Sequence, residues 1–353
     1  MRCYCVLHHG QALELVERPT PNPQGSEILL KVKAAGVCHT DLHLWEGYYD
    51  LGGGKKLRLA DRGIKPPLTL SHEIVGEVVA IGPDAQRSSG ASIGQVALLH
   101  PWIGCGQCIA CQRGEEYICV KPQALGIARP GGFADYVLIP HPRYLVSIDG
   151  LNPAQAAPLA CAGVTTYSAL KKFGERITTD LLVIIGAGGL GLMAIEVLKA
   201  LGGMGAIVVD RDPSKLEAAR QAGALHVIDA NEHDAVQQIQ ALTQGGSRGV
   251  LDLVGATATL DLAVNSAARG GQIVICGLMG GDFNLAIPII PMRPLTIQGS
   301  YVGSLLELKE LVSLFKRTGM KPIPVTTRPL DEANLAMEDL LAGRVLGRTV
   351  LIP

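Results

Sequence analysis

The sequence has 353 residues, of which 48% are hydrophobic, only 4% are aromatic and 43 are glycine. A chain of this length is expected to form two domains, and this composition is typical of strands and helices packed in α/β layers. The 31 basic residues almost balance the 32 acidic ones. This charge excludes a partner such as nucleic acid or an anionic membrane, and it favours a small-molecule substrate.

The amino-terminal segment has no apolar signal core, and the longest uncharged apolar run, residues 181–195, is short and glycine-rich for a bilayer span. We therefore expect a soluble, cytoplasmic protein. The chain has nine cysteines, an odd number that disfavours complete disulfide pairing. Four of them lie between Cys105 and Cys119, which indicates metal ligation in a reducing compartment.

The first 150 residues are predicted to be mostly β. Residues 26–35 alternate apolar and charged side chains for part of their length, and residues 73–81 behave similarly. Gly-Pro, Gly-Gly and single prolines separate such short strands, as in a partly open barrel. Between them lies a polar insertion, residues 45–67, which by composition is expected to be a solvated surface loop. Its cations are Lys55, Lys56, Arg58, Arg62 and Lys65.

Residues 36–43 bring a thiol, two imidazoles, a hydroxyl and a carboxylate into eight positions. Alone, this stretch also fits a buried cysteine beside a surface histidine. Together with downstream residues it indicates half of a metal site: Cys38, His72 and Cys161 would bind Zn²⁺ and leave a fourth position open, as catalysis requires. Asp41 is near enough in sequence to orient one of the ligands.

The most specific spacing in the chain is Cys105-x2-Cys108-x2-Cys111-x7-Cys119. Four thiolates within fifteen residues can complete a tetrahedron around one Zn²⁺ and leave no position for a substrate, so this site should be structural. The alternative is four reduced thiols in a loop. Loss of this zinc should loosen the lobe without stopping the chemistry directly.

A dinucleotide-binding turn follows an apolar run at residues 181–185. The turn reads Gly186-Ala187-Gly188-Gly189-Leu190-Gly191 and opens a helix to Ala200. The first glycine should make the tight turn, the second should let a pyrophosphate approach, and the third should let helix and strand pack closely. Asp210 ends the next strand, where ribose hydroxyls would lie, so we expect NAD rather than NADP. Arg211 could instead pair with a 2′-phosphate, and Lys215 is a further candidate for the cofactor.

Further apolar runs at residues 226–230, 251–254, 272–277 and 295–300 alternate with helices that begin near Ser214, Asp234 and Ala258. They predict an α/β fold with a doubly wound, parallel six-stranded sheet. The run 295–300 should lie at an edge that needs covering, so we expect an oligomer, with a tetramer favoured over a dimer. Residues 305–316 should form a helix that stops at Gly319, and residues 347–353 a closing strand. Arg348 in that strand is by default a surface charge, with phosphate contact as the alternative.

These motifs resemble those of the zinc-containing medium-chain alcohol dehydrogenases, with matches from about residue 36 to 348. The metal motifs appear as Cys38-His39-Thr40-Asp41, as Ser71-His72-Glu73 and as Cys161-Ala162-Gly163, and the cysteine quartet also matches. Where this chain has Ser71, the family usually has Gly. The resemblance implies a mainly β, GroES-like catalytic domain at residues 1–162, a Rossmann domain at 163–298, and a return to the catalytic domain at 299–353.

The same resemblance implies two zinc ions per chain, with Cys38, His72 and Cys161 at the catalytic ion and the quartet at the structural one. Asp41 would orient His72, and Glu73 would lie near the metal as an outer or transient ligand. Thr40 would pass the alcohol proton through the cofactor ribose to His43. The remaining implied contacts are His39 and Arg348 on pyrophosphate, Leu278 and Met279 on the nicotinamide, and Trp45 and Trp102 in the substrate cleft.

The implied reaction is NAD-linked oxidation of a primary alcohol, with zinc as the Lewis acid. From the residues alone, a hydroxyl three positions before an imidazole can form a proton relay. His43 could equally be a surface or capping residue, and the two tryptophans could be core residues.

Within the family, residues 45–67 and 101–106 resemble those of bacterial 6-hydroxyhexanoate dehydrogenases, which oxidise an ω-hydroxy acid. We hypothesise that a cation of the insertion binds the distal carboxylate. The alternatives are a broad primary or benzylic alcohol dehydrogenase and a sorbitol- or threonine-type enzyme. In a different class are a zinc-free quinone or enone reductase and a dinucleotide-binding protein without activity.

Overall fold

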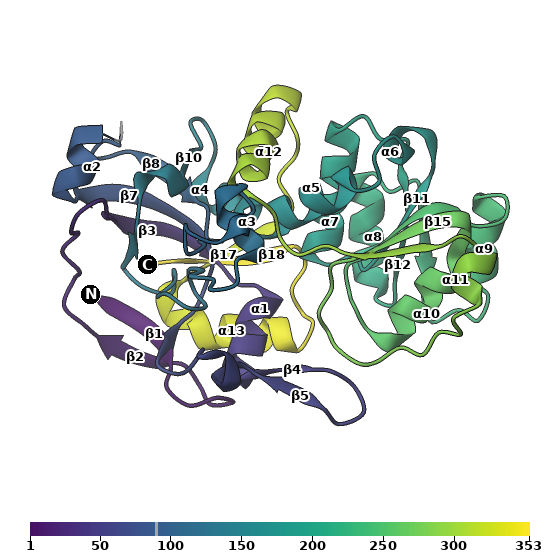
Figure 1. Ribbon diagram of the computed structural model, residues 1–353, viewed down its shortest axis with the longest axis horizontal. Helices are drawn as coiled ribbons and strands as arrows, with labels where there is room; N and C mark the ends of the chain where they lie inside the picture. Colours follow the sequence, from purple (N-terminus) through teal and green to yellow (C-terminus); the bar gives the residue numbers. More distant parts are fainter. Residues whose placement is uncertain (89–90) are drawn as a thin grey trace.

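A computed structural model describes residues 1–88 and 91–353. The chain forms two lobes that lie side by side along the long axis of the molecule (Figure 1). One lobe contains both termini and is mainly β, and the other is built around the six-stranded sheet. The domain boundaries near residues 162 and 298 stay a prediction. No helix in the described part of the chain is long and apolar enough to cross a membrane.

The mainly β lobe contains two sheets. The smaller sheet has the order β2-β1-β6, and the larger has the order β10-β8-β7-β3-β18-β17, with β9 also paired to β3. The bounds of these strands are β1 Arg2–Val6, β2 Glu14–Glu17, β3 Ile28–Gly36, β6 Leu68–Thr69, β7 Glu73–Ile81, β8 Val96–Leu99, β9 Tyr136–Ile139, β10 Leu145–Ser147, β17 Val325–Pro329 and β18 Arg348–Ile352. The expected closing strand is therefore confirmed, and it lies inside the sheet between β3 and β17.

Short helices connect these strands. They are α1 His39–Glu46, α2 Pro83–Ser88, α3 Ile109–Gln112, α4 Pro153–Ala156, α12 Leu305–Thr318 and α13 Ala333–Leu341, with 3-10 turns η1 Leu59–Arg62, η2 Glu116–Ile118, η3 Pro142–Tyr144, η4 Ala157–Ala160 and η5 Leu330–Glu332. Helix α12 shows why the sequence forms them. Ser304 and Glu307 make a capping box at its start, its buried residues recur at helical spacing, and Gly319 ends it with φ +64°.

The six-stranded sheet has the order β13-β12-β11-β14-β15-β16, and every pair in it is parallel. The predicted doubly wound fold is confirmed. Its strands are β11 Leu182–Ile185, β12 Ala206–Asp210, β13 His226–Asp229, β14 Ser247–Asp252, β15 Ala267–Ile275 and β16 Thr296–Gly299; its helices are α5 Ala162–Lys171, α6 Arg176–Thr179, α7 Gly189–Ala200, α8 Pro213–Ala222, α9 Ala235–Leu242, α10 Thr257–Ser266 and α11 Ile289–Met292. The strand order reverses between β11 and β14. In sheets of this kind, dinucleotides bind in the crevice at the carboxyl ends of the strands on either side of the reversal.

The continuous apolar run of β11 reflects burial on both faces of the sheet. Ile184 packs into a core that continues into the mainly β lobe, whereas its neighbours Val183 and Ile185 pack into a separate core under α9 and α10. The shared core also contains Cys38, and it continues through α5 and α12. The two lobes therefore hold the residues of the predicted metal site in one packed unit.

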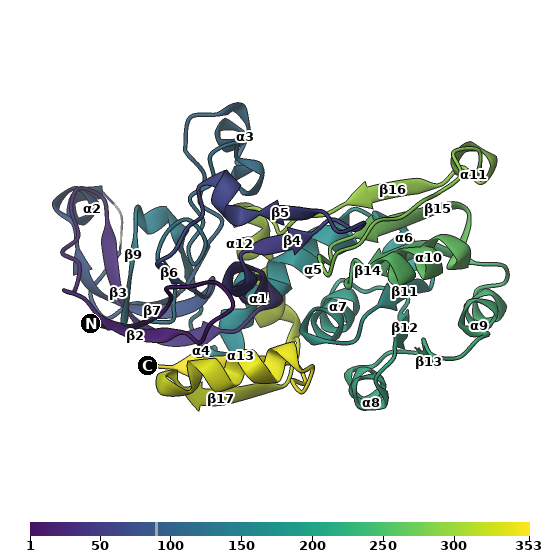
Figure 2. The ribbon, with the colours of Figure 1, turned by 90° about the horizontal axis from the view of Figure 1, so that it is seen from below.

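The polar insertion forms structure that its composition did not reveal. Its residues build a hairpin of β4, Tyr48–Asp50, and β5, Lys56–Arg58, which extends toward the other lobe in both views (Figures 1 and 2). A Cβ on Gly52 at the tip would lie 2.4 Å from the backbone nitrogen of Asp282. The expectation of a merely solvated loop is thus corrected: the hairpin bridges the lobes.

Candidate functional site

Cys38, His72 and Cys161 meet although 123 residues separate the two cysteines. Their ligand atoms all lie within 4.8 Å of one another, and the two sulfurs are 3.9 Å apart. Tetrahedral Zn–S bonds of about 2.3 Å would put two sulfurs about 3.8 Å apart, so the spacing fits zinc. All three side chains are buried, and neither nitrogen of His72 has a hydrogen-bond partner within the described residues. Two soft thiols and an unpaired imidazole are the donor set that zinc prefers.

The electrostatics favour a thiolate at this cluster. The hydrogen bond from the Cys161 thiol lowers the pKa of Cys38 well below its usual value against the opposing effect of burial, and Arg348 and His72 lower it further. Burial alone would lower the pKa of His72, but the nearby Cys38 sulfur and the charge of Asp41 raise it to about 9. The positive charges of Arg348 and His72 therefore stabilise the thiolate form of Cys38, which is the form that binds a metal cation.

Asp41 connects the two loops that supply Cys38 and His72. Cys38 is the N-cap of α1, and its backbone N–H donates to Asp41 Oδ2 at 2.8 Å. The other oxygen, Oδ1, accepts the N–H of Ser71 at 2.9 Å and lies 3.8 Å from His72 Nδ1. Because Asp41 is fully buried, each of these contacts replaces water. Its proximity to His72 supports the proposed orienting role.

The departure at Ser71 has a structural explanation. Ser71 has φ +70°, a left-handed conformation that glycine adopts without strain. Its hydroxyl donates to the carbonyl oxygen of Gly36 at 2.9 Å, which gives the serine a hydrogen bond that glycine could not make. The same turn is packed tightly from the other side, since a Cβ on Gly131 would lie 2.1 Å from the carbonyl oxygen of Ser71.

This balance predicts different losses for two small substitutions. Ser71→Ala keeps the left-handed strain and loses the hydrogen bond to Gly36, so we expect a loss of about 1–2 kcal/mol in unfolding free energy. Ser71→Gly loses the same bond but relieves about 1 kcal/mol of strain. Urea unfolding of the zinc-loaded proteins should therefore rank the glycine variant above the alanine variant. An alanine variant at least as stable as the glycine variant would contradict this account.

Glu73 and Arg348 form a buried ion pair beside the cluster. Arg348 Nη2 lies 2.9 Å from Glu73 Oε1, and the two side chains are 2% and 0% exposed. The default expectation of a surface charge at Arg348 is therefore wrong. Glu73 Oε2 lies in the space that a side chain at position 36 would fill, since a Cβ on Gly36 would be 2.1 Å from this oxygen. Glu73 Oε2 has no hydrogen-bond partner within the described residues. Burial raises the pKa of Glu73 to about 7 against the attraction of Arg348.

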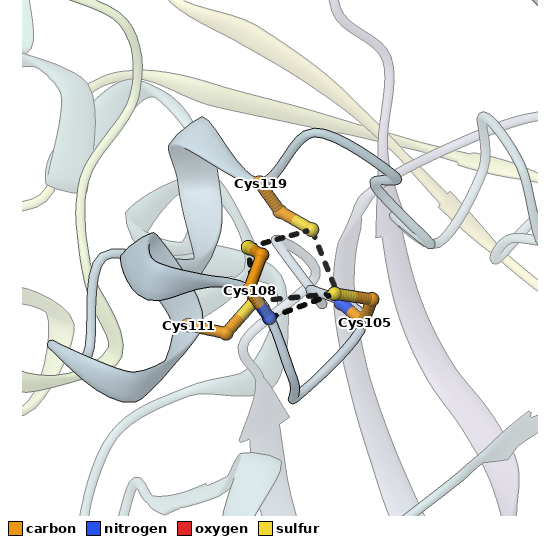
Figure 3. A group of neighbouring side chains, drawn as sticks. All are labelled: Cys105, Cys108, Cys111 and Cys119. Atoms are coloured by element: carbon orange, nitrogen blue, oxygen red, sulfur yellow. Dashed lines mark hydrogen bonds between the residues drawn. The ribbon is translucent and has the colours of Figure 1, made fainter.

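The cysteine quartet gathers its four sulfurs at the tip of a separate projection (Figure 3). Cys108 Sγ lies 3.5 Å from Cys111 Sγ and 3.7 Å from Cys119 Sγ, and Cys105 Sγ lies 4.0 Å from Cys111 Sγ. Backbone N–H groups donate to the sulfurs of Cys105 and Cys119, and such bonds stabilise thiolates. No disulfide links the nine cysteines, all of which lie in the described part of the chain. The arrangement fits one tetrahedral Zn²⁺ with no open position.

Glu116 supports this projection, a role that the sequence did not reveal. Its buried carboxylate accepts the N–H of Gly104 at 2.8 Å and the hydroxyl of Tyr144 at 2.7 Å, and Arg143 lies 3.0 Å away. These contacts connect the cysteine projection to η3, directly before β10, and so to the body of the lobe. The sequence does not indicate this role of Glu116, because its hydrogen-bond partners lie 12 to 28 positions away along the chain.

The glycine-rich turn lies at the carboxyl end of β11. Gly186 has φ +99°, and a Cβ on Gly191 would lie 2.0 Å from the carbonyl oxygen of Gly186, so helix and strand pack too closely for a side chain. A Cβ on Gly188 would meet nothing within 4 Å. The second glycine therefore faces open space at the start of α7, where an anion can approach the backbone.

Several candidate cofactor residues surround this turn. Asp210 Oδ2 accepts the N–H of Ala187 at 2.7 Å, and a Cβ on Gly189 would lie 3.5 Å from Arg348 Nη1. Desolvation lowers the pKa of His39 against the charge of Cys38, and Arg348, His43 and Lys215 lower it further. Lys215 also lies 4.0 Å from Asp212, whereas Arg211 is exposed on the turn after β12. Leu190 is part of the first turn of α7.

The proposed relay and substrate residues separate into two groups. Thr40 and His43 occupy neighbouring turns of α1, and the His43 ring lies 4.6 Å from the Tyr49 ring. Trp102 is buried with its ring 5.2 Å from His72 and its N–H donating to the carbonyl of Ala160. Trp45 instead donates to the carbonyl of Gln11 and packs against the core of the mainly β lobe. The contacts of Trp102 support a place in the substrate cleft, and those of Trp45 favour core packing.

A cavity of about 490 Å³ lies between the hairpin and the carboxyl ends of β14 and β15, a volume in the range of small-molecule sites. Leu278 lines it on the nucleotide side, and Tyr49, Arg62 and Tyr301 line it on the other. Met279 follows Leu278 and is 54% exposed. The Tyr301 ring lies 6.0 Å from that of Trp102, so the cavity adjoins the Cys38, His72 and Cys161 cluster.

Two family models match the two parts of this architecture. Residues 24–150 match the alcohol dehydrogenase GroES-like domain, and residues 189–317 match the zinc-binding dehydrogenase domain. Over the whole length of both proteins, the chain is 39% identical to an NAD-dependent alcohol dehydrogenase of Sulfurisphaera tokodaii. The chain belongs to the zinc-type medium-chain alcohol dehydrogenase family. The resemblance found in the metal and nucleotide motifs is thus confirmed at the level of the family.

Other family members cover the same length. An NAD-dependent alcohol dehydrogenase of Saccharolobus solfataricus is 38% identical over 100% of both chains. A D-arabinose 1-dehydrogenase (NADP(+)) of the same organism is 32% identical over 98% of this chain and 95% of its own. The crystal structure of the alcohol dehydrogenase of Aeropyrum pernix aligns over 100% of both chains with a TM-score of 0.90 and 32% identity. The family therefore accommodates different substrates and cofactors on one fold.

Proposed function

We propose that this chain catalyses the reversible, NAD-linked oxidation of a primary alcohol to an aldehyde at the cluster of Cys38, His72 and Cys161. The observation that carries the proposal is the buried set of two thiols and an unpaired imidazole within 4.8 Å of one another, beside a cavity that reaches the carboxyl ends of β14 and β15. Zinc bound there would supply a Lewis acid that lowers the pKa of the alcohol, and NAD would accept the hydride.

The chain's own residues then position the reactants. Gly186, Gly188 and Gly191 would shape the turn for the pyrophosphate, with Gly189 and Leu190 opening α7 behind it. Arg348 would add positive charge at the same place, and His39 would offer a ring N–H. Asp210 would bind the ribose hydroxyls, and Leu278 and Met279 would lie against the nicotinamide. Thr40 would take the hydroxyl proton and pass it through the ribose to His43. The surrounding apolar walls would exclude water from the reacting atoms.

The quartet of Cys105, Cys108, Cys111 and Cys119 would hold a second, structural zinc, which gives two ions per chain. A zinc-free reductase or a silent dinucleotide-binding protein would need neither donor set, so metal analysis separates these classes. The unpaired cysteines support a reducing compartment, and we place the protein in the cytoplasm.

The substrate we propose is an ω-hydroxy acid such as 6-hydroxyhexanoate, with a broad primary or benzylic alcohol dehydrogenase as the second candidate. The support is a cation in the wall of the cavity beside the predicted metal site. The test is a screen of NAD reduction by the zinc-loaded protein with primary and benzylic alcohols, diols, ω-hydroxy acids and an aldopentose. Absence of NAD reduction with every alcohol would refute the dehydrogenase proposal.

Cofactor choice gives a separate prediction. If Asp210 binds the ribose hydroxyls, Asp210→Ser should lower kcat/KM for NAD by about 10- to 100-fold, because charge-assisted hydrogen bonds contribute about 1.5–3 kcal/mol. The NADP value should change little or rise. Asp229→Ser is the matched control, since Asp229 ends the neighbouring strand and accepts the N–H of Asn231. An unchanged ratio of NAD to NADP activity in Asp210→Ser would contradict the assignment.

The edge strand supports an oligomer. All four residues of β16 are exposed, and Ile287 and Met292, in the segment before it, are 79% and 67% exposed. An open parallel edge with apolar neighbours is a surface that a second subunit can cover. We propose a homo-oligomer, with a tetramer favoured over a dimer, and light scattering should give a multiple of the 37.1 kDa chain mass. A monomeric mass would contradict it.

A further inference from the structure

We propose that Arg62 is the residue that selects substrates with a carboxylate remote from the reacting hydroxyl. The inference rests on the proposed alcohol dehydrogenase function and adds a specificity-determining residue to it. Arg62 ends η1, directly after the bridging hairpin, and its side chain lines the interlobe cavity.

Position distinguishes Arg62 from the other cations of the insertion. Among the described residues, the cavity wall includes Arg62 but not Lys55, Lys56, Arg58 or Lys65. Lys56 lies 3.5 Å above the centre of the Tyr48 ring, and Arg58 pairs with Tyr48 across the hairpin. One cation of the insertion is therefore turned toward the substrate space.

Two tyrosines share the cavity wall with Arg62 and contact rings near the metal-ligand cluster. The ring of Tyr49 lies 4.6 Å from that of His43, and the ring of Tyr301 lies 6.0 Å from that of Trp102. Burial and the charge of Cys161 together raise the pKa of Tyr301 to about 12, against the opposing charge of Arg62. Burial likewise raises the pKa of Tyr49. The charge of Cys38 also raises it, and the charge of Arg62 lowers it. The charges of the sulfur cluster and of Arg62 therefore both act on these two tyrosines.

Two of the three carboxylates that line the cavity accept hydrogen bonds from the chain itself. Asp252 is buried and accepts the N–H groups of Val254 and Gly255 and the hydroxyl of Thr259. Asp50 accepts the N–H of Gly52 at 2.9 Å, and the carboxyl carbon of Asp282 lies beside the same tip glycine. Within the described residues, no ion pair joins Arg62 to a carboxylate. Its guanidinium is left with donors for a ligand.

This geometry fits a substrate with two functional ends. A hydroxyl at the predicted metal site and a carboxylate at Arg62 would place an apolar spacer between Tyr49 and Tyr301. Guanidinium groups bind carboxylates in a bidentate manner, whereas a neutral alcohol would leave the cation without a partner. Arg62 is itself exposed to solvent, so its contribution is expected to be moderate and sensitive to salt.

The experiment compares 6-hydroxyhexanoate with hexan-1-ol, using the zinc-loaded full-length protein, NAD and low salt. The wild type should favour the hydroxy acid by about 10-fold in kcat/KM, and Arg62→Gln should abolish that preference mainly through KM. The hexan-1-ol value should stay within about 2-fold, Arg62→Lys should keep part of the preference, and 0.5 M salt should weaken it. Arg58→Gln removes a nearby cation that does not line the cavity and should behave as wild type.

A binding measurement complements the kinetics. Calorimetric titration of hexanoate into the complex with NADH should show affinity that falls about 10-fold in Arg62→Gln and not in Arg58→Gln. The inference is overturned if the wild type oxidises hexan-1-ol without preferring the hydroxy acid, or if Arg62→Gln keeps the preference, or if Arg58→Gln loses it equally. In all three cases the proposed dehydrogenase function stands. Failure of the wild type to oxidise any alcohol refutes that function and this inference together.

Discussion

Cys161→Ser is expected to lower kcat/KM for alcohol oxidation by about 1000-fold or more and to reduce the zinc content from two ions per chain to one. The reason is that the serine hydroxyl is a poor replacement for a thiolate that should hold the reactive ion together with Cys38 and His72. Lewis-acid stabilisation is worth several kcal/mol, which corresponds to a loss of this size. Elemental analysis and NAD reduction on the same sample measure both effects.

Cys108→Ser is the matched control, because it should remove one zinc ion from the other site. The cysteine projection should loosen, as limited proteolysis near residues 105–119 would show, while activity per folded molecule should stay within a few-fold of wild type. Two variants with equal metal loss and unequal activity would separate the roles of the two sites. Equal activity in both variants would contradict the proposed division into a reactive and a structural ion.

The second large effect concerns the ion pair of Arg348 and Glu73. Arg348→Met should destabilise the zinc-loaded protein by about 3–5 kcal/mol, because it leaves the buried Glu73 carboxylate without its partner. The midpoint of urea unfolding, measured without nucleotide, reports this loss independently of any role of Arg348 at the pyrophosphate.

The double variant Arg348→Met with Glu73→Gln tests the cause. Removing both charges of a buried pair is often nearly neutral, so most of the lost stability should return. Arg344→Met is the matched control, because Arg344 is an exposed arginine near the same strand. Its ion pair with Asp339 should contribute less than about 1 kcal/mol. A double variant as unstable as Arg348→Met would show that packing of the arginine stem, rather than the unpaired charge, is responsible.

Local patterns in the sequence predicted most of the fold. The apolar runs located all six strands of the parallel sheet because burial on both faces leaves a continuous signal. Strands β14 and β15 begin four and five residues earlier than predicted, at Ser247 and Ala267, since their first residues are mostly small or polar and do not extend the apolar run. The cysteine spacing and the glycine turn were also visible, because each places its chemistry within about fifteen residues.

Features made by distant residues were not visible in the same way. Arg348 follows a glycine in a tail of ordinary composition, and nothing in that tail indicates a carboxylate 275 positions earlier. The insertion was expected to be solvated because its glycines and cations are typical of loops, yet its tip contacts Asp282 in the other lobe. The resemblance supplied Glu73 and Arg348 as functional residues, but their contact with each other required the three-dimensional structure.

Strand β18 has a consequence for how the chain folds. It pairs with β3 and β17 inside the sheet and brings Arg348 to a carboxylate 275 positions earlier in the sequence, beside the metal-ligand cluster. The buried Glu73 therefore gains its counter-charge only through a contact of very long sequence separation. Because closing such a loop costs entropy before the contact repays it, we expect the mainly β lobe to fold more slowly than segments built from local contacts.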